Sequence, residues 1–200
     1  MRLTTTDGWT SPLSSDFSHK SKASSWRTIP LPQHIGVLAT EGTIKSQSYN
    51  LEIEKLYPDC TVVGQACPMW VPLVENNEFD KPGADYFVRD SLQKLLEQDP
   101  LIDTIILGCT HFPLLLPKIE QQLAQLSTGN SQLSTIKIIP QGQYIASSLE
   151  DYLHRHPEMD ERLTRGGTCQ YLTTESATKF RESASLFLNE EVEVQHIALN

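Results

Sequence analysis

The chain has 200 residues, of which 38% are hydrophobic and 20% are charged, and its formal net charge is −9. This acidity, without a Lys/Arg cluster, argues against nucleic acid or an anionic membrane as a partner. No apolar run approaches the ~20 residues that a membrane-spanning helix needs. The length suits one sizeable α/β domain, or one and a half small ones.

The thiols and the amino-terminal segment indicate a reducing compartment. The four cysteines are far apart in the sequence and no CxxC motif pairs them: Cys60, Cys67, Cys109 and Cys169. The first residues contain no apolar stretch of the kind that a secretion signal needs. Cysteines in such a chain are expected to be free thiols in the cytoplasm rather than disulfide partners.

Residues 1–33 differ in composition from the remainder. They are rich in Ser and Thr, contain three prolines, and show neither helical nor alternating apolar spacing. Such a segment lacks the apolar residues needed to bury a core. We therefore predict that 1–33 is a disordered or non-native leader and that the folded part begins at residue 34.

From residue 34 onward, short apolar runs alternate with amphipathic segments. Strands are predicted at 35–39, 60–66, 102–107, 136–139 and 169–173, the first and third of them buried, with a shorter strand within 192–197. Helices are predicted at 44–56, 84–98, 115–126, 143–154 and 177–188. Residues 40–43 are predicted to form a polar turn, and Pro68 and Pro72 to mark a loop after the second strand. The alternation predicts an α/β fold in which a parallel sheet has helices on both faces.

In a parallel sheet, ligands bind beyond the carboxyl ends of the strands. This rule directs attention to two loops, 40–43 and 108–113. In the second loop, Gly108 permits a tight turn, and Cys109 stands just before a helix, where N–H groups and the helix dipole favour a thiolate. His111 could act as an acid or bind a carboxylate. The thiolate could serve as a nucleophile, a metal ligand or a proton-transfer base, and a small buried thiol is the alternative.

Other chemistries find less support in the sequence. Cys109 and His111 could be two metal ligands, but no third ligand stands at a typical spacing. A cysteine-dependent hydrolase built on the same pair lacks an identifiable Asp or Asn partner. His154 and His156 end a predicted helix, where solvated histidines are ordinary. Glu75 closes the proline-marked apolar loop and could face either the same crevice or solvent.

Three segments together resemble the glutamate racemase family, within the aspartate/glutamate racemases. They are GVLATEGTIKS at 36–46, ACP with VPLVE at 66–68 and 71–75, and GCTHFPLL at 108–115. The Thr-His after the cysteine separates this family from aspartate and hydantoin racemases. The resemblance covers about residues 34–200. It implies two similar α/β domains and a cofactor-independent interconversion of L- and D-glutamate for peptidoglycan synthesis.

The resemblance also implies roles for individual residues. In the family, two thiols act on opposite faces of the substrate α-carbon, because a single base would return a proton to the face it came from. Cys109 matches the second of these catalytic cysteines, and His111 matches the histidine that assists it. Cys67 belongs to the family pattern but is not one of the two bases. The substrate-facing positions are matched by Thr40, Thr43, Thr110 and Glu75.

The first catalytic cysteine of the family has no counterpart here. It stands in a Cys-Asn-Thr motif of the first domain, and residues 1–33 contain no cysteine. We therefore expect a carboxyl-terminal part of a racemase: 34–135 as the α/β domain with the second cysteine, and 136–200 as a remnant that returns to the missing first domain. Such a chain is expected to bind L- or D-glutamate, to be inactive alone, and to form a homodimer or join a missing amino-terminal half. The alternatives are a non-catalytic fragment and a related aspartate or hydantoin racemase.

Overall fold

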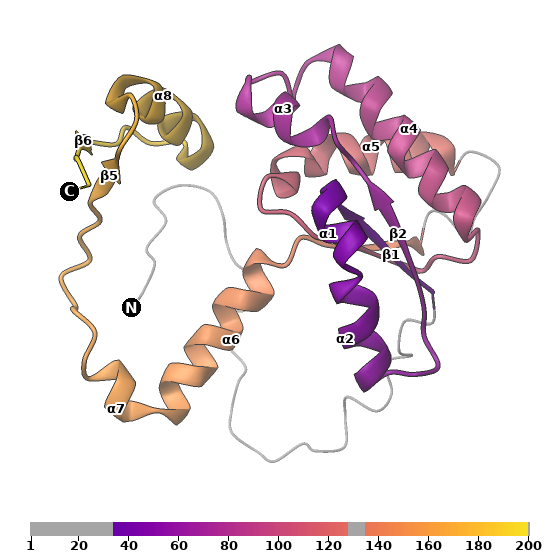
Figure 1. Ribbon diagram of the computed structural model, residues 1–200, viewed down its shortest axis with the longest axis horizontal. Coiled ribbons are helices and arrows are strands. Elements are labelled where there is room, and N and C mark those ends of the chain that lie inside the picture. The colour runs from indigo at the N-terminus through magenta and orange to yellow at the C-terminus, as the bar shows by residue number, and fades with distance from the viewer. Residues whose placement is uncertain (1–33, 128–134, 200) are drawn as a thin grey trace.

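The computed structural model describes residues 34–127 and 135–199, and the leader predicted at 1–33 lies outside these described residues. Within them, four parallel strands form one sheet in the order β2-β1-β3-β4 (Figure 1). The strands are β1 His34–Ala39, β2 Thr61–Ala66, β3 Thr104–Leu107 and β4 Lys137–Ile139. The register pairs Leu38 of β1 with Gln65 on one side and Leu107 on the other. The predicted parallel α/β fold is confirmed.

Helices cover both faces of this sheet. On one face lie α3 Trp70–Glu75, α4 Pro82–Gln98, the short 3-10 helix η2 Phe112–Leu115 and α5 Leu116–Leu126. On the other face lie α1 Glu41–Ser46 and α2 Ser48–Leu56. Side chains of β1 alternate between two apolar clusters: Leu38 packs toward α4, whereas Val37 and Ala39 pack toward α1 and α2. A strand that is apolar on both faces is typical of a parallel sheet buried on both sides.

The first helical segment begins earlier than predicted and is divided in two. The predicted turn at 40–43 and the single helix at 44–56 are wrong. The Thr40 hydroxyl accepts a hydrogen bond from the Thr43 N–H and caps α1, so the helix begins directly after β1. Gln47 then adopts a left-handed conformation with φ 53° and separates α1 from α2.

The short helix α3 occupies the segment that Pro68 and Pro72 predicted to be a loop. Proline lacks an N–H donor, but the first turn of a helix does not need that donor. Trp70 and Val74 are both fully buried in the core. Burial of one face of α3 therefore outweighs the loop preference of its prolines.

Beyond β4, the chain leaves the main sheet through two helices and ends in a small group of two strands and one helix (Figure 1). The two helices are α6 Gly142–Arg155 and α7 Pro157–Asp160, and the group that follows is β5 Tyr171–Thr173, α8 Ala177–Leu188 and β6 Val194–His196. Strands β5 and β6 form a second parallel sheet. Helix α6 has no buried residue and exposes four large side chains, Tyr144, Ile145, Leu149 and Tyr152. The domain boundary expected at 135/136 stays a prediction, and β4 just beyond it completes the main sheet.

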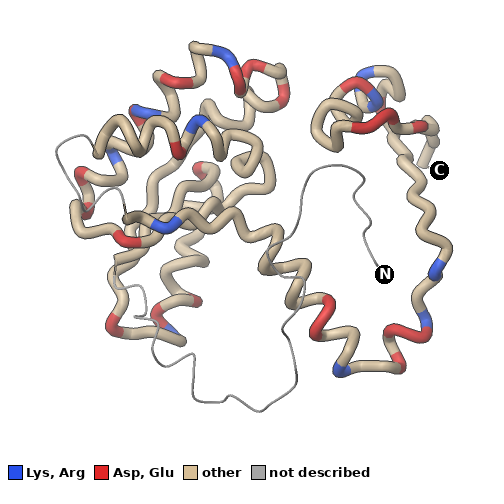
Figure 2. The backbone as a smooth tube through the Cα atoms, turned by 180° about the vertical axis from the view of Figure 1, so that it is seen from behind, with Lys and Arg blue, Asp and Glu red and all other residues tan. Residues whose placement is uncertain are grey.

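Charged residues lie along the surface helices and loops (Figure 2). Several form ion pairs one helical turn apart: Lys45–Glu41, Lys94–Asp90 and Arg155–Asp151. Exposed pairs of this kind contribute only about 0.3–0.5 kcal/mol each, so the buried apolar side chains carry most of the stability. Among the described residues, no helix combines the length and apolar character needed to cross a membrane.

Gly36 in β1 packs closely against α4, so a substitution at this position tests how tightly the core is packed. A β-carbon added there would lie 2.8 Å from Leu95 Cδ2 and 3.1 Å from Ile102 Cδ1. Because Leu95 is fully buried, we expect Gly36→Ala to lower the free energy of unfolding by about 1–3 kcal/mol. Urea denaturation followed by circular dichroism measures this loss. Gly83→Ala is the matched control, since nothing lies within 4 Å of its added carbon; equal losses would contradict the packing argument.

A polar link closes the amino-terminal end of β1. His34 Nδ1 lies 2.7 Å from Asp99 Oδ2, and the Leu101 N–H donates to Asp99 Oδ1 at 2.9 Å. Burial raises the pKa of Asp99, but these hydrogen bonds and the charge of His34 outweigh it and hold the pKa below its usual value. The carboxylate therefore stabilises the folded state, and this contribution is lost as the pH falls through the lowered pKa.

We expect Asp99→Asn to lower the free energy of unfolding by about 1.5–3 kcal/mol near neutral pH, the usual range for hydrogen bonds to a charged group. The difference from the unsubstituted chain should shrink as the pH falls from about 5 toward 2, because the carboxyl then becomes neutral in both states. Thermal melts across this pH range measure the difference, with Asp80→Asn as control because Asp80 is exposed. A difference that persists undiminished at the lowest pH would show that the carboxylate charge is not the cause.

Candidate active site

The carboxyl ends of the parallel strands bring three loops to one edge of the sheet. Thr40 follows β1, Cys109 follows β3 after one glycine, and Gln141 lies just beyond β4. The Gly108 N–H donates to the Leu38 carbonyl at 2.8 Å and extends the pairing of β3 with β1 past the last strand residue. The two loops that the sheet rule selects from the sequence therefore leave the sheet side by side.

A thiol, an imidazole and a carboxylate form a chain of contacts at this edge. Cys109 Sγ lies 3.8 Å from His111 Nδ1, and His111 Nε2 lies 2.5 Å from Glu75 Oε1. Cys109 and His111 are half-buried, and Glu75 is exposed. Glu75 ends α3, while the other two residues lie between β3 and η2. The structure thus brings together three of the predicted site residues.

The contact with Glu75 determines the roles of the two ring nitrogens of His111. A carboxylate only accepts hydrogen bonds, so Nε2 carries a proton and donates it to Glu75. In the neutral ring, Nδ1 is then the acceptor, and it is the nitrogen that faces Cys109. This arrangement can take a proton from the thiol, which is what activates a cysteine as base or nucleophile.

Apolar packing positions Glu75 beside His111. Trp70 of α3 and Phe112 of η2 are fully buried, and their ring centroids lie 4.7 Å apart. Trp70 Nε1 also donates to the Phe87 carbonyl at 3.4 Å, which ties α3 to α4. Because Phe112 directly follows His111, the contact between the two rings sets the spacing of the carboxylate and the imidazole.

Gly108 allows the Cys109 loop to lie close to the sheet. A β-carbon at this position would lie 3.0 Å from Ala39 Cβ and 3.1 Å from Tyr49 Cε2. Contacts this short would push the loop away from β1 and α2. Glycine is needed here for space, since the backbone approaches its neighbours too closely for a side chain.

The threonine loop is arranged around the start of α1. Thr40 Oγ1 lies 2.9 Å from Thr43 Oγ1 and accepts from the Thr43 N–H at 3.4 Å. Thr110, next to Cys109, is exposed. Thr40 and Thr110 lie in loops at the carboxyl edge of the sheet and Thr43 lies in the first turn of α1; the substrate-binding roles of all three stay predictions.

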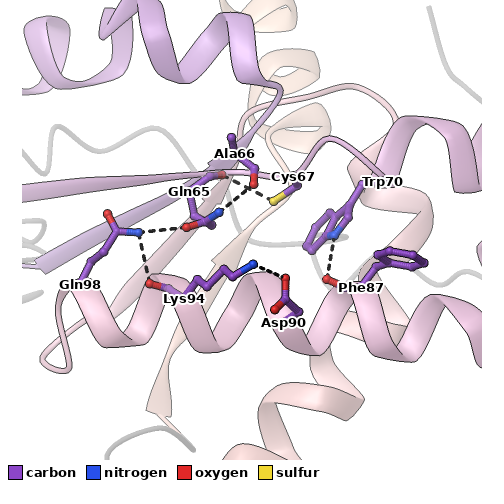
Figure 3. A network of polar contacts seen from close by, with 8 residues as sticks. All are labelled: Gln65, Ala66, Cys67, Trp70, Phe87, Asp90, Lys94 and Gln98. Atoms are coloured by element: carbon purple, nitrogen blue, oxygen red, sulfur yellow. Dashed lines mark hydrogen bonds and ion pairs between the residues drawn. The ribbon is translucent and has the colours of Figure 1, made fainter.

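Cys67 lies at the end of β2, in a polar network that joins this strand to α4 (Figure 3). Its thiol donates to the Gln65 carbonyl at 3.5 Å, and Gln98 Nε2 donates to Gln65 Oε1 at 3.1 Å. Cys67 is only 1% exposed, and burial raises the pKa of its thiol to about 12. Such a thiol is protonated at neutral pH, so Cys67 is poorly suited to act as a base.

Two residues that sequence inspection did not select reach the Cys109 loop. Gln141 Nε2 donates to the Leu107 carbonyl at 2.6 Å and to the Tyr49 hydroxyl at 2.9 Å. For Gln141, the sequence signal was the proline–glutamine–glycine turn directly after a predicted strand, whereas Tyr49 lies within a predicted helix and has no such signal. The rule that selected Cys109 also applies to a polar residue in that position.

A cavity of about 270 Å³ lies beside Glu75. Helix α8 supplies much of the opposite wall, including Lys179 and Ser183. Phe187 of the same helix contacts Phe79, with ring centroids 6.4 Å apart. Glu175 also lines this space, so two carboxylates and one ammonium group face it together with the hydroxyl groups.

A metal site built on Cys109 and His111 would need further ligands. In the parts of the chain that the structure describes, no group of three His, Cys, Asp or Glu side chains could hold a metal ion. Cys109 and His111 therefore stay a pair. His154 and His156 lie at the end of α6, where His156 Nδ1 is 3.2 Å from Glu158 Oε1.

The sequence matches the Asp/Glu/Hydantoin racemase family over residues 22–138. This match includes the last part of the predicted leader. A glutamate racemase from Lactiplantibacillus plantarum is 38% identical over 167 residues, which cover 82% of this chain and 57% of that protein. One from Streptococcus thermophilus is 34% identical over 166 residues, covering 83% and 57%. The chain thus spans a little more than half the length of these relatives.

Solved structures share the fold. A glutamate racemase isoform from Bacillus anthracis has a TM-score of 0.66 and 29% identity, covering 84% of this chain and 59% of that chain. One from Francisella tularensis, solved with D-glutamate, has a TM-score of 0.69 and 24% identity with the same coverage. Since the family match covers more than half of the chain, the protein belongs to the Asp/Glu/Hydantoin racemase family.

Proposed function

We propose that this chain carries one proton-transfer half of a glutamate racemase site, with Cys109 as the group that moves the α-proton of glutamate. The observation that carries the proposal is the chain of contacts from Cys109 through His111 to Glu75 at the carboxyl edge of the sheet. Similarity to the glutamate racemases of Lactiplantibacillus plantarum and Streptococcus thermophilus supports glutamate as the substrate.

The proposed step begins with activation of the thiol. His111 accepts the Cys109 proton at Nδ1, and Glu75 stabilises the resulting imidazolium through Nε2. The thiolate then removes the α-proton: the C–H bond breaks, an S–H bond forms, and the electron pair passes into the substrate's α-carboxylate. The threonines at 40, 43 and 110 supply hydroxyl groups for the substrate carboxylates. The step needs no cofactor.

Inversion needs a second acid/base group on the opposite face of the α-carbon. The other thiols are poorly placed: Cys67 is buried with its pKa raised to about 12, Cys60 precedes β2 at the far edge of the sheet, and Cys169 lies before β5. We therefore propose that another polypeptide segment supplies this group, either an amino-terminal racemase domain or a second copy of the chain.

The proposed product is D-glutamate, made in the cytoplasm for peptidoglycan synthesis. The same proton transfer on aspartate or a hydantoin is the second candidate, and the breadth of the matched family supports it. A fragment without catalytic activity is the third, and it is one outcome of the isotope-exchange experiment below.

The thiols should differ in their reaction with iodoacetamide at pH 8. We expect Cys109 and Cys169 to be alkylated and Cys67 to stay unmodified. With a pKa of about 12, only ~10⁻⁴ of the Cys67 thiol is ionised at that pH. Peptide mass spectrometry over a time course measures each site separately. Alkylation of Cys67 as fast as Cys109 would contradict its burial.

We expect the chain to exchange the α-proton of one glutamate isomer for deuterium without forming the other isomer. Proton NMR in D2O measures exchange, and circular dichroism measures inversion. Cys109→Ala should slow exchange at least about 10²-fold, the usual contribution of a positioned acid/base group. Cys169→Ala is the matched control, because this exposed thiol lies outside the proposed site, and it should keep the full rate.

Each outcome separates the candidates. Inversion that is lost in Cys109→Ala would support a glutamate racemase but contradict the one-sided site. Exchange of aspartate without exchange of glutamate would favour the second candidate. No exchange of any substrate by the folded chain would reject the enzyme in favour of a non-catalytic fragment.

A further inference from the structure

The ladder between β3 and β4 gains one extra hydrogen bond from a side chain. The Lys137 N–H donates to the Asp103 carbonyl at 2.9 Å, and the two strands run parallel. In a parallel ladder every second residue bonds the same neighbour, so this register leads to the N–H of residue 141 opposite the Leu107 carbonyl. The side-chain amide of Gln141 takes that place, donating to the Leu107 carbonyl at 2.6 Å.

The backbone turns away from the sheet at the same residue. Gln141 has φ 62° and ψ −41°, and the Gly142 N–H donates to the Pro140 carbonyl at 2.8 Å, which closes a three-residue turn. A residue other than glycine rarely adopts such a conformation unless surrounding contacts hold it. The same turn that removes the backbone donor from the ladder directs the amide donor into it.

The amide of Gln141 also contacts α2, the helix that covers one face of the sheet. Its Nε2 donates to the Tyr49 hydroxyl of α2 at 2.9 Å. The Tyr49 ring lies against Gly108, where an added β-carbon would be 3.1 Å from Cε2. One amide thus joins α2, the last residue of β3 and the start of α6, and it does so immediately before Gly108 and Cys109.

We propose that Gln141 is a positioning residue for Cys109. By holding the Leu107 carbonyl and the Tyr49 ring, the amide fixes the path of the chain through Gly108 and so the place of the thiol relative to His111. The proposal rests on the proposed function for its catalytic consequence. The placement of the thiol can be measured separately, through its reactivity.

Four variants of the 200-residue chain separate the amide from the strained backbone. Gln141→Leu removes the donors and keeps a side chain of comparable volume, and Gln141→Gly removes the donors and relieves the backbone. Tyr49→Phe removes only the second acceptor. Gln143→Leu is the matched control, since Gln143 is exposed in α6. Each variant is tested for alkylation of Cys109, Cys67 and Cys169 and for α-proton exchange of glutamate.

We expect both Gln141 variants to raise the alkylation rate of Cys109 relative to Cys169, while Cys67 stays protected. The exchange rate constant kcat should fall by about 10-fold to 100-fold, with a smaller change in KM, because small displacements of a catalytic group have effects of this size. Tyr49→Phe should lie between these variants and the Gln143→Leu control.

Two results would overturn the proposal. In one, the reactivity of Cys109 in both Gln141 variants equals that of the control. In the other, Cys67 becomes reactive together with Cys109, which would mean that the amide stabilises the whole domain rather than the loop. If the unsubstituted chain exchanges no glutamate, the proposed function fails, and the alkylation rates still decide the role of Gln141.

Discussion

The parallel pairing of β1 with both β2 and β3 is the constraint on which the candidate site depends. Parallel strands end at the same edge of a sheet, so the residues after β1 and β3 leave it together. The hydrogen bond from the Gly108 N–H to the Leu38 carbonyl extends this order into the loop that carries Cys109. A chain with the same loops but antiparallel strands would place these two exits at opposite edges.

The chemistry of the site depends on apolar packing as well as on topology. Glu75 is exposed, yet its helix is held by Trp70, which is fully buried against Phe112. The carboxylate therefore meets His111 at 2.5 Å without a rigid loop of its own. A polar chain whose members are anchored by buried neighbours can keep its geometry while it stays open to a substrate.

Much of the fold and part of the site could be predicted from the sequence. The apolar runs at 35–39 and 102–107 contain most of β1 and all of β3, because strands of a parallel sheet are covered on both faces. The glycine that follows the second run pointed to Cys109. The helix α3 was missed because prolines dominate its pattern, while burial of Trp70 decides its structure. Gln141 was missed because its role depends on strand register and a strained turn, and neither has a signature in composition.

The proposed one-sided chemistry and the exposed helix α6 meet at one residue. One thiol serves one face of an α-carbon, and inversion needs a group on the other face. Helix α6 has no buried residue, and a two-stranded parallel sheet is too small to be stable unless it packs against other elements. Gln141 links the Cys109 loop to α6, because its amide contacts the Leu107 carbonyl and its backbone is the N-cap of the helix. If Gln141 has the proposed positioning role, a change at the start of α6 is therefore transmitted to Cys109 through the Leu107 carbonyl and Gly108.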